Sequence, residues 1–351
     1  LYPKFDAHDT IKYRSIEYNN FIKAIELKNN WKKATFEYNN DIYDVLIKIH
    51  GRSPVKQYFE GNYSLGVKVL NNEKINGCTR FNLIIYNRIK DKAEVLYKLA
   101  NSFDLIHQIS ELFLIKINQE NPYLYLFEQR FNNGFFKEIE KPLVSLKYKS
   151  DHSLLYISGD INKLNKNLRK AIKKKKLSNE LSYSIYNIYS KLNLAIVNRN
   201  LDGILNHFDI EYLSKIYAYI YLTNPTGHGF SYNNLTVAID TNTLHLYPII
   251  HRDMDFNPIK DKNYKLQSNF WKYFNNPLFQ TLNKSIVIKA KATSYLKDYL
   301  LKNAKDDVHQ INIIKESHAQ LFYNSLINSK LNHNGISIIE NNVDFLKKRL
   351  I

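Results

Sequence analysis

Cysteine is almost absent from this chain. Cys78 is the single cysteine among 351 residues. One thiol cannot close an internal disulfide, and it cannot supply the several thiolates that hold a structural zinc ion. The cysteine count therefore excludes a disulfide-stabilised scaffold and a zinc-finger type of protein.

Glycine and long apolar runs are also scarce. No apolar run reaches the roughly 18 residues that a membrane-spanning helix needs, so no transmembrane segment is expected. The 44% hydrophobic content is sufficient for one large domain or two lobes with a sizeable core. The opening segment, "LYPKFDAHDT", does not resemble a signal peptide. Removal of an upstream signal would place the protein outside the cytoplasm or on a cell or spore surface; otherwise it is cytoplasmic.

Acidic residues are outnumbered by basic ones. The chain has 33 acidic and 50 basic residues, so its formal net charge is +17. Such a charge attracts polyanions. An equally good explanation is that the lysines only keep the protein surface hydrated. The basic run "LRKAIKKKK" at 168–176 is a candidate polyanion contact, and its alternative is a solvated helix face.

The stretch "HRDMDF", His251 to Phe256, contains the tripeptide that opens the catalytic loop of protein kinases. That loop reads H-R-D-L-x-x-x-N, and its Asn helps to hold a metal ion. The required Asn position is occupied by Pro258, and no D-F-G follows. Asp253 is therefore not the base of a kinase catalytic loop.

Apolar periodicity divides the chain into a strand-rich first part and a helical second part. Expected strands are a hairpin over 34–48 that turns at 39–41, and single strands over 63–70, 78–85, 122–131, 235–239 and 244–250. Expected helices are one or two over 89–116, and others over 161–200, 209–222, 308–331 and 339–350. Asp209 is a suitable N-cap for the helix that follows it.

The order of the elements over 209–256 matches the lower lobe of a protein kinase. A buried helix is followed by a polar loop with His and Asn, two short strands, and then Asp-x-Asp. In kinases the catalytic loop, a small hairpin and a metal-binding Asp follow one another in this order. The predicted fold is therefore α+β and two-lobed, like a protein kinase. A mostly β N-lobe with one main helix spans 1–140, and a mainly helical C-lobe spans 141–351.

Four segments together resemble the CotH kinases, a divergent kinase-like family named for a spore coat protein. They are "GRSPVKQYFEGNYSLGVKV" at 51–69, "FNLIIYNRIKDKAEVLYKLA" at 81–100, "NPYLYLFEQRFNNGFFKE" at 121–138 and "GHGFSYNNLTVAIDTNTLHLYPIIHRDMDF" at 227–256. The resemblance covers about residues 50 to 260. The chain differs from the family at Gly227, where the family often has an Asp that orients the acceptor hydroxyl.

The resemblance implies nucleotide-binding residues in the N-terminal part. Lys68, in a Val-Lys-Val strand, is expected to contact the α and β phosphates of ATP. Glu94 is the expected acidic partner of that lysine, with Asp91 as the alternative. Glu128 lies at the end of an apolar strand, where it is either part of the adenine-binding hinge or a member of a structural ion pair.

The catalytic loop and the hairpin supply the remaining candidates. His228, between two glycines, is expected to orient the acceptor hydroxyl or to accept its proton. Asn234, with Asn233 as the alternative, is expected to bind a divalent metal. Asp253 and Asp255 point the same way on an extended chain, and two adjacent carboxylates repel unless a cation lies between them. We expect Mg²⁺ or Mn²⁺ there.

These features predict an ATP-dependent protein kinase of CotH type that phosphorylates Ser or Thr hydroxyls of a protein substrate. Because Gly227 replaces the acceptor-orienting Asp, the alternatives are a pseudokinase or a kinase fold that transfers a nucleotidyl group. The net charge of +17 adds a third alternative, a non-enzymatic polyanion-binding protein.

Substitution Asp253→Ala is expected to abolish metal-dependent ATP binding, because the divalent ion loses one of its carboxylate ligands, Asp253 or Asp255 being the principal one. The fold should persist, since a surface carboxylate rarely contributes more than about 1 kcal/mol to stability. Thermal shift with ATP and Mn²⁺ measures both effects. A variant that binds ATP and metal as well as the parent protein would show that the metal assignment is wrong.

Overall fold

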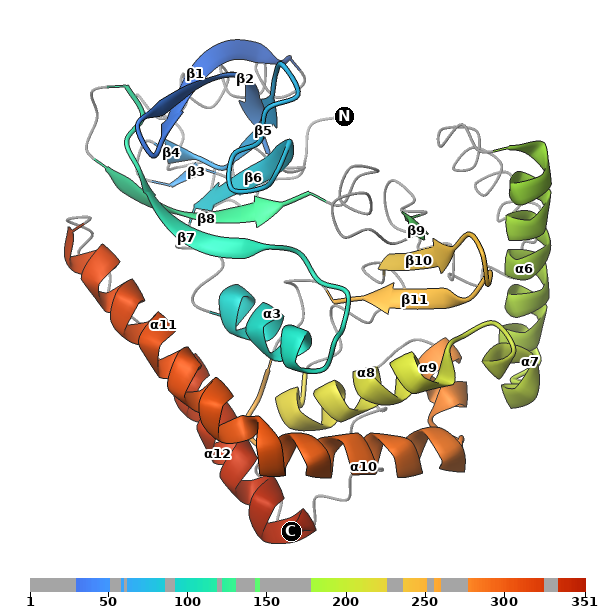
Figure 1. The fold of residues 1–351 in the computed structure, drawn as a ribbon. Coiled ribbons are helices and arrows are strands. Elements are labelled where there is room, and N and C mark those ends of the chain that lie inside the picture. The colour runs from blue at the N-terminus through green and yellow to red at the C-terminus, as the bar shows by residue number, and fades with distance from the viewer. Residues whose placement is uncertain are drawn as a thin grey trace, which may run out of the picture. The chain divides into compact units, whose positions relative to one another are not determined.

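The computed structural model describes residues 30–50, 58–59, 62–85, 92–118, 122–130, 143–145, 178–225, 236–250, 256–259, 277–324 and 334–351. These residues form an α+β structure with one curled antiparallel sheet and several helices (Figure 1). The internal contacts divide the chain into two compact units. The first contains residues 1–90, 109–130 and 320–329, and the second contains the remainder.

A six-stranded sheet forms the body of the first unit. Its strands are β1 (Lys32–Tyr38), β2 (Asp41–Ile49), β5 (Leu65–Val69), β6 (Arg80–Ile85), β7 (Ser110–Ile115) and β8 (Tyr123–Gln129). Their spatial order is β1-β2-β5-β6-β8-β7, and every neighbouring pair is antiparallel. A separate short pair joins β3 (Tyr58–Phe59) to β4 (Asn62–Tyr63).

The predicted hairpin at the start of the sheet is confirmed. Its two strands are β1 and β2, and the turn between them consists of Asn39 and Asn40. Both asparagines have positive φ angles, 54° and 68°. A two-residue turn with positive φ at both positions matches the twist of the flanking strands, and asparagine tolerates that conformation better than most residues.

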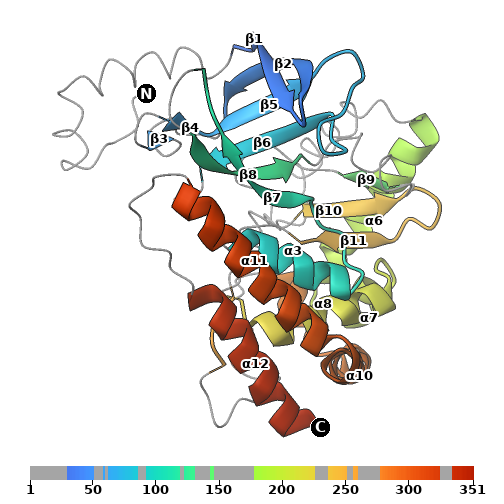
Figure 2. The same cartoon turned by 60° about the vertical axis from the view of Figure 1, so that its left-hand side comes forward.

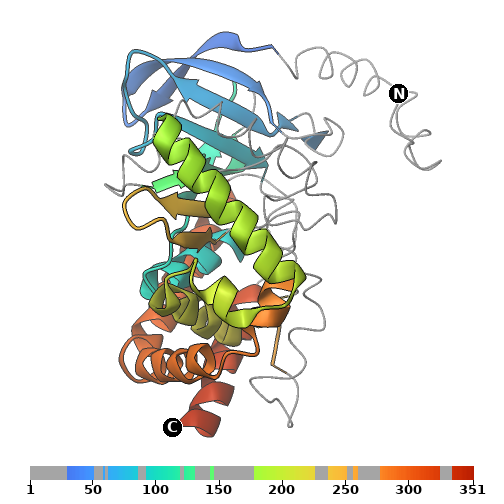
Figure 3. The same ribbon diagram turned by 90° about the vertical axis from the view of Figure 1, so that its right-hand side faces the viewer.

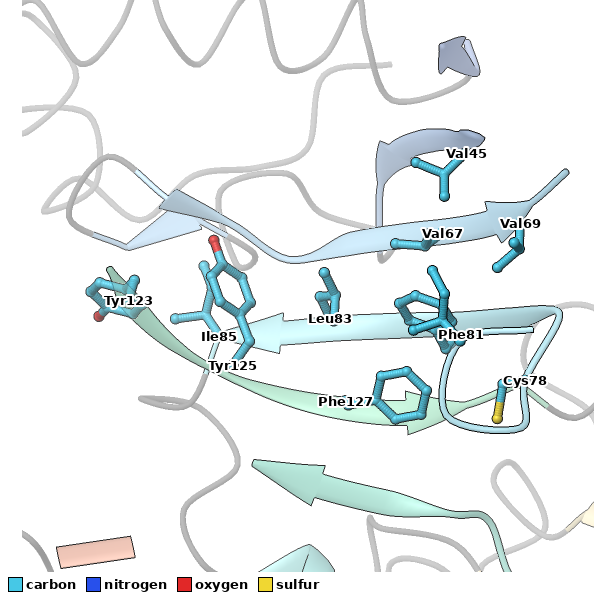
Figure 4. Close-up of a cluster of buried hydrophobic side chains, with 11 residues drawn as sticks. Val45, Val67, Val69, Cys78, Phe81, Leu83, Ile85, Tyr123, Tyr125 and Phe127 are labelled. Atoms are coloured by element: carbon cyan, nitrogen blue, oxygen red, sulfur yellow. The ribbon is translucent and has the colours of Figure 1, made fainter. Parts of the chain in front are cut away.

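One face of the six-stranded sheet is a hydrophobic core (Figure 4). Its buried members include Val67, Phe81, Leu83, Tyr125 and Phe127, which alternate along their strands with residues of the opposite face. The Phe81 and Phe127 rings stack with their centroids 4.4 Å apart. Such alternation is the two-residue period of a strand, and it assigns every second side chain to the core.

The expectation of helix throughout 89–116 is wrong in its second half. Helix α3 (Lys92–Ser102) ends early, and Ser110–Ile115 is instead the edge strand β7. Asp104 has a φ of 51°, a left-handed conformation that a helix cannot continue through. The apolar spacing of this segment fits either period, and pairing of β7 with β8 decides in favour of the strand.

The second unit is mainly helical and holds one small sheet. Its helices are α3, α6 (Asn179–Val197), α7 (Leu201–Leu205), α8 (Ile210–Thr223), α9 (Pro277–Leu282), α10 (Ile286–Lys302), most of α11 (Ala304–Asn324) and α12 (Asn334–Leu350). The small sheet contains β9 (Leu143–Ser145), β10 (Thr236–Asp240) and β11 (Leu246–Ile249) in the order β11-β10-β9 (Figure 3).

Helix α8 is the centre of the second unit. Asp209 caps it as expected, since its Oδ1 accepts a hydrogen bond from the Tyr212 backbone N–H at 2.9 Å. Almost every residue of α8 is buried, as expected for a helix that is apolar on all sides. Helix α10 packs beside α8, and α12 contacts both of them (Figure 2).

Tyrosine hydroxyls on α8 connect it to its neighbours. The Tyr212 hydroxyl accepts a hydrogen bond from the Ile106 backbone N–H and donates to the Pro248 carbonyl, each at 2.9 Å. The Tyr219 hydroxyl donates to the Leu96 carbonyl at 3.3 Å. These tyrosines therefore combine the packing of a large ring with a partner for a buried backbone group.

Among the residues that the structure describes, no helix combines the length and the apolar character needed to cross a membrane.

Substitution Tyr212→Phe is expected to destabilise the protein by about 2 kcal/mol, because the Ile106 N–H loses its acceptor and the Pro248 carbonyl loses a donor. Chemical denaturation measures this loss. Tyr183→Phe is the control, because Tyr183 is 68% exposed and should tolerate loss of its hydroxyl. Equal stabilities of the two variants would contradict the role given to Tyr212.

Candidate functional site

The face of the six-stranded sheet opposite the hydrophobic core carries a group of polar and charged side chains. We call this group the polar face. It consists of Lys48, Gly66, Lys68, Arg80, Asn82, Ser110, Glu128 and Arg130. All of these residues belong to the first unit, so the polar face can be described within that unit alone.

Strand register places five of these residues in one row across the sheet. Lys48 pairs with Gly66, Gly66 with Asn82, Asn82 with Glu128, and Glu128 with Ser110. Side chains that are paired in this way point to the same side and lie within contact distance. We call Gly66, Asn82, Glu128 and Ser110 the polar row.

Two residues further along the strands lies a basic row. Lys68 pairs with Arg80, and the Arg130 backbone N–H donates to the Arg80 carbonyl at 3.1 Å. Two residues along a strand correspond to about 7 Å. The basic row therefore lies directly beside the polar row on the same face.

The side chains of Arg130 and Lys48 lie beside Gly66. A Cβ at position 66 would lie 3.7 Å from the Arg130 guanidinium and 3.7 Å from Cγ of Lys48. Burial lowers the pKa of the Arg130 guanidinium and the nearby Arg80 lowers it further, whereas Glu128 raises it. The guanidinium therefore lies among the other charges of this face.

The polar face is strongly basic. Lys48, Lys68, Arg80 and Arg130 accompany the carboxylate of Glu128, and nearer to β1 the same side of the sheet carries Lys33, Glu37 and Asp44. Lysine and arginine side chains at this density attract multiply charged anions. This is a local concentration of positive charge, distinct from the net charge of the whole chain.

Gly66, Asn82 and Glu128 of the polar row are buried, Ser110 is partly buried, and the polar atoms of the row are only partly paired by hydrogen bonds. Asn82 is 5% exposed and Glu128 is 2% exposed. The Asn82 side-chain amide donates to Glu128 Oε2 at 3.3 Å. Two further buried oxygens of this row, Asn82 Oδ1 and Ser110 Oγ, have no hydrogen-bond partner.

Two residues predicted from the sequence, Lys68 and Glu128, lie together on the polar face, two strands apart. Glu94 lies in the first turn of α3, which belongs to the second unit. Its pairing with Lys68 therefore stays a prediction. The other candidates lie outside the described residues: Asp91, His228, Asn233, Asn234, Asp253, Asp255 and the basic run 168–176.

Sequence reasoning missed Arg80, Asn82, Ser110 and Arg130. A signal for the first two was present, because "RFNLII" is a strand in which Arg80 and Asn82 alternate with Phe81 and Leu83. Ser110 and Arg130 could not be predicted as their neighbours, because the sequence of one strand does not determine its register with a distant strand.

The described residues contain no group of three or more His, Cys, Asp or Glu side chains that could hold a metal ion. The predicted metal ligands, Asn234, Asp253 and Asp255, lie outside them. The polar row itself contains one carboxylate, that of Glu128.

A groove of about 530 Å³ lies along the two edge strands of the sheet. One side is formed by β1 and its turn, from Thr35 to Asn40, and the other by β7, from Leu112 to Lys116. The Tyr38 and Phe113 rings stack across it with their centroids 5.6 Å apart. The sheet thus curls until its edges approach, which leaves the polar face on the outside of the curl.

No protein-family model matches the chain, and no curated protein matches it.

Substitution Glu128→Ala is expected to destabilise the protein by about 2 kcal/mol, since the buried Asn82 amide loses its acceptor. Glu128→Gln retains an oxygen acceptor and should cost less. Chemical denaturation of the two variants tests whether the carboxylate has a structural role. Wild-type stability in Glu128→Ala would assign Glu128 to ligand binding alone.

Proposed function

We propose that this chain is an ATP-dependent protein kinase of CotH type, which transfers the γ-phosphoryl group to Ser or Thr hydroxyls of a protein substrate. The observation that supports the proposal best is the polar face. Lys68 and Glu128, chosen from the sequence as nucleotide-binding residues, lie on that face together with Arg80 and Arg130.

The basic row accounts for phosphate binding in this proposal. A triphosphate carries about four negative charges, and Lys68, Arg80 and Arg130 offer compact and planar cations for its oxygens. Phosphoryl transfer requires little covalent chemistry from the protein, because positioning and neutralisation of charge supply most of the catalysis. Cations fixed on strands of one sheet satisfy both requirements.

Arg80 is a further candidate for the main phosphate contact. In kinases the phosphate-binding Lys lies on the strand that precedes the helix carrying its Glu partner. Here the strand that directly precedes α3 is β6, which contains Arg80, whereas Lys68 lies one strand earlier on β5. The two residues are register partners, so both can reach one phosphate chain.

The second part of the proposed mechanism rests on the sequence. Asn234, Asp253 and Asp255 would hold Mg²⁺ or Mn²⁺, which neutralises charge on the phosphates. His228 would orient the acceptor hydroxyl or accept its proton. Because Gly227 replaces the Asp of the family, the nature of the transferred group needs its own test. The mass of the product separates phosphoryl transfer from nucleotidyl transfer, and a pseudokinase yields neither product.

Substitution Lys68→Ala is expected to weaken ATP affinity about tenfold or more, which corresponds to ~1.4 kcal/mol, because one cation of the basic row is lost. Arg80→Ala should have a similar effect. Isothermal titration calorimetry with ATP and Mn²⁺ measures both losses. Lys74→Ala is the matched control, since Lys74 is an exposed residue of the same unit and lies outside the polar face.

Neutralisation of the lysines in 168–176 discriminates the main alternative. A kinase should keep its ATP affinity in that variant. A loss equal to that of Lys68→Ala, with a similar response to any phosphate-rich polymer and no need for a metal ion, would favour the polyanion-binding function instead.

A further inference from the structure

Two oxygen atoms of the polar row have no hydrogen-bond partner within the protein. Asn82 Oδ1 and Ser110 Oγ are buried without a hydrogen bond, and they flank Glu128 on neighbouring strands. A buried polar atom without a partner costs about 1–3 kcal/mol. Two such atoms in one row of a sheet indicate that another group provides the missing hydrogen bonds when it binds.

The chemistry of the row defines that group. The Asn82 oxygen and the Glu128 carboxylate can only accept hydrogen bonds, and the Ser110 hydroxyl can accept or donate. The matching ligand therefore presents two or more donors close together. Vicinal hydroxyl groups of a sugar fit this description, and carboxylates bind ribose hydroxyls in nucleotide sites of other folds.

The neighbouring rows indicate what the sugar is attached to. On one side lies the basic row with Lys68, Arg80 and Arg130. On the other side the same face is apolar, with Ile84 paired to Leu126 and Leu126 paired to Leu112. The polarity of the face thus changes from cations through hydrogen-bonding groups to hydrocarbon. Phosphate, ribose and base follow one another in the same order in a nucleotide.

We propose that the polar row binds the ribose hydroxyls of a nucleotide, with Asn82 and Ser110 as binding residues beside Glu128. The proposal rests on the proposed nucleotide-dependent function and adds the recognition of the sugar. The Arg130 side chain lies beside Gly66, at the Lys48 end of the row, and would turn toward the phosphates when a nucleotide binds.

Ser110→Ala is the most informative variant. Its hydroxyl has no partner in the protein, so its removal should leave the stability of the free protein unchanged or slightly raised. It should nevertheless lower ATP affinity about fivefold. A purely structural residue would not separate stability from binding in this way, and an ordered water at Ser110 would leave ATP affinity unchanged.

Calorimetry with four ligands tests the proposal: ATP, 2′,3′-dideoxy-ATP, inosine triphosphate and inorganic tripolyphosphate, each with Mn²⁺. Wild-type protein should bind ATP about tenfold more tightly than the dideoxy nucleotide. Ser110→Ala and Asn82→Leu should reduce this ratio toward one and leave tripolyphosphate affinity unchanged. Asn312→Leu is the control, because Asn312 lies in α11 of the second unit and bonds to Glu340.

Each of the other outcomes would contradict one part of the proposal. Equal binding of ATP and dideoxy-ATP by wild-type protein would overturn recognition of the ribose and leave the phosphate contacts standing. An ATP preference that both variants retain would overturn the roles of Asn82 and Ser110 alone. Variants that instead lose the distinction between ATP and inosine triphosphate would move the contact to the base amine. Failure of wild-type protein to bind either ATP or tripolyphosphate would overturn the proposed function itself.

Discussion

Antiparallel pairing of β5, β6 and β8 is the constraint on which the candidate site depends. Each strand alternates core residues with polar or charged ones, and the observed register aligns these alternations across the sheet. A shift by one residue would place Lys68 in the core and Val67 on the opposite face. Packing of the hydrophobic core, in which Phe81 stacks on Phe127, fixes this register. It therefore also fixes the positions of the charged side chains on the polar face. Stability and the arrangement of the site have the same origin in this unit.

In the second unit, polar backbone groups are buried around the apolar helix α8 and need hydrogen-bond partners. Most residues of helix α8 are buried, and its tyrosines bring hydroxyl groups to backbone atoms of neighbouring elements. Phenylalanine at position 212 would fill the same volume but leave the Ile106 N–H without its acceptor. The abundance of tyrosine thus has a structural use in this unit, since one residue type provides both packing and hydrogen bonding.

Apolar periodicity and turn residues predicted most of the helices and strands. They could not predict which distant strands pair with each other. The first hairpin, the strands around Lys68 and Glu128, and the helix capped by Asp209 follow from periodicity and turn chemistry. Strand β7 was predicted as helix, because its apolar spacing fits both periods and only its pairing with β8 distinguishes them. For the same reason Lys68 and Glu128 could be chosen individually, whereas their neighbours Asn82 and Ser110 required the register. The kinase-like arrangement of two lobes remains part of the proposal.

The most direct test of the proposed function is incubation of the protein with labelled ATP and Mn²⁺, followed by mass spectrometry of the chain itself. We expect a metal-dependent increase in mass by whole phosphoryl groups on Ser or Thr residues, with much less transfer when Lys68 or Asp253 is replaced by Ala. Transfer of adenylate would keep the nucleotide site and change the reaction. Absence of any metal-dependent ATP binding or turnover would contradict the account.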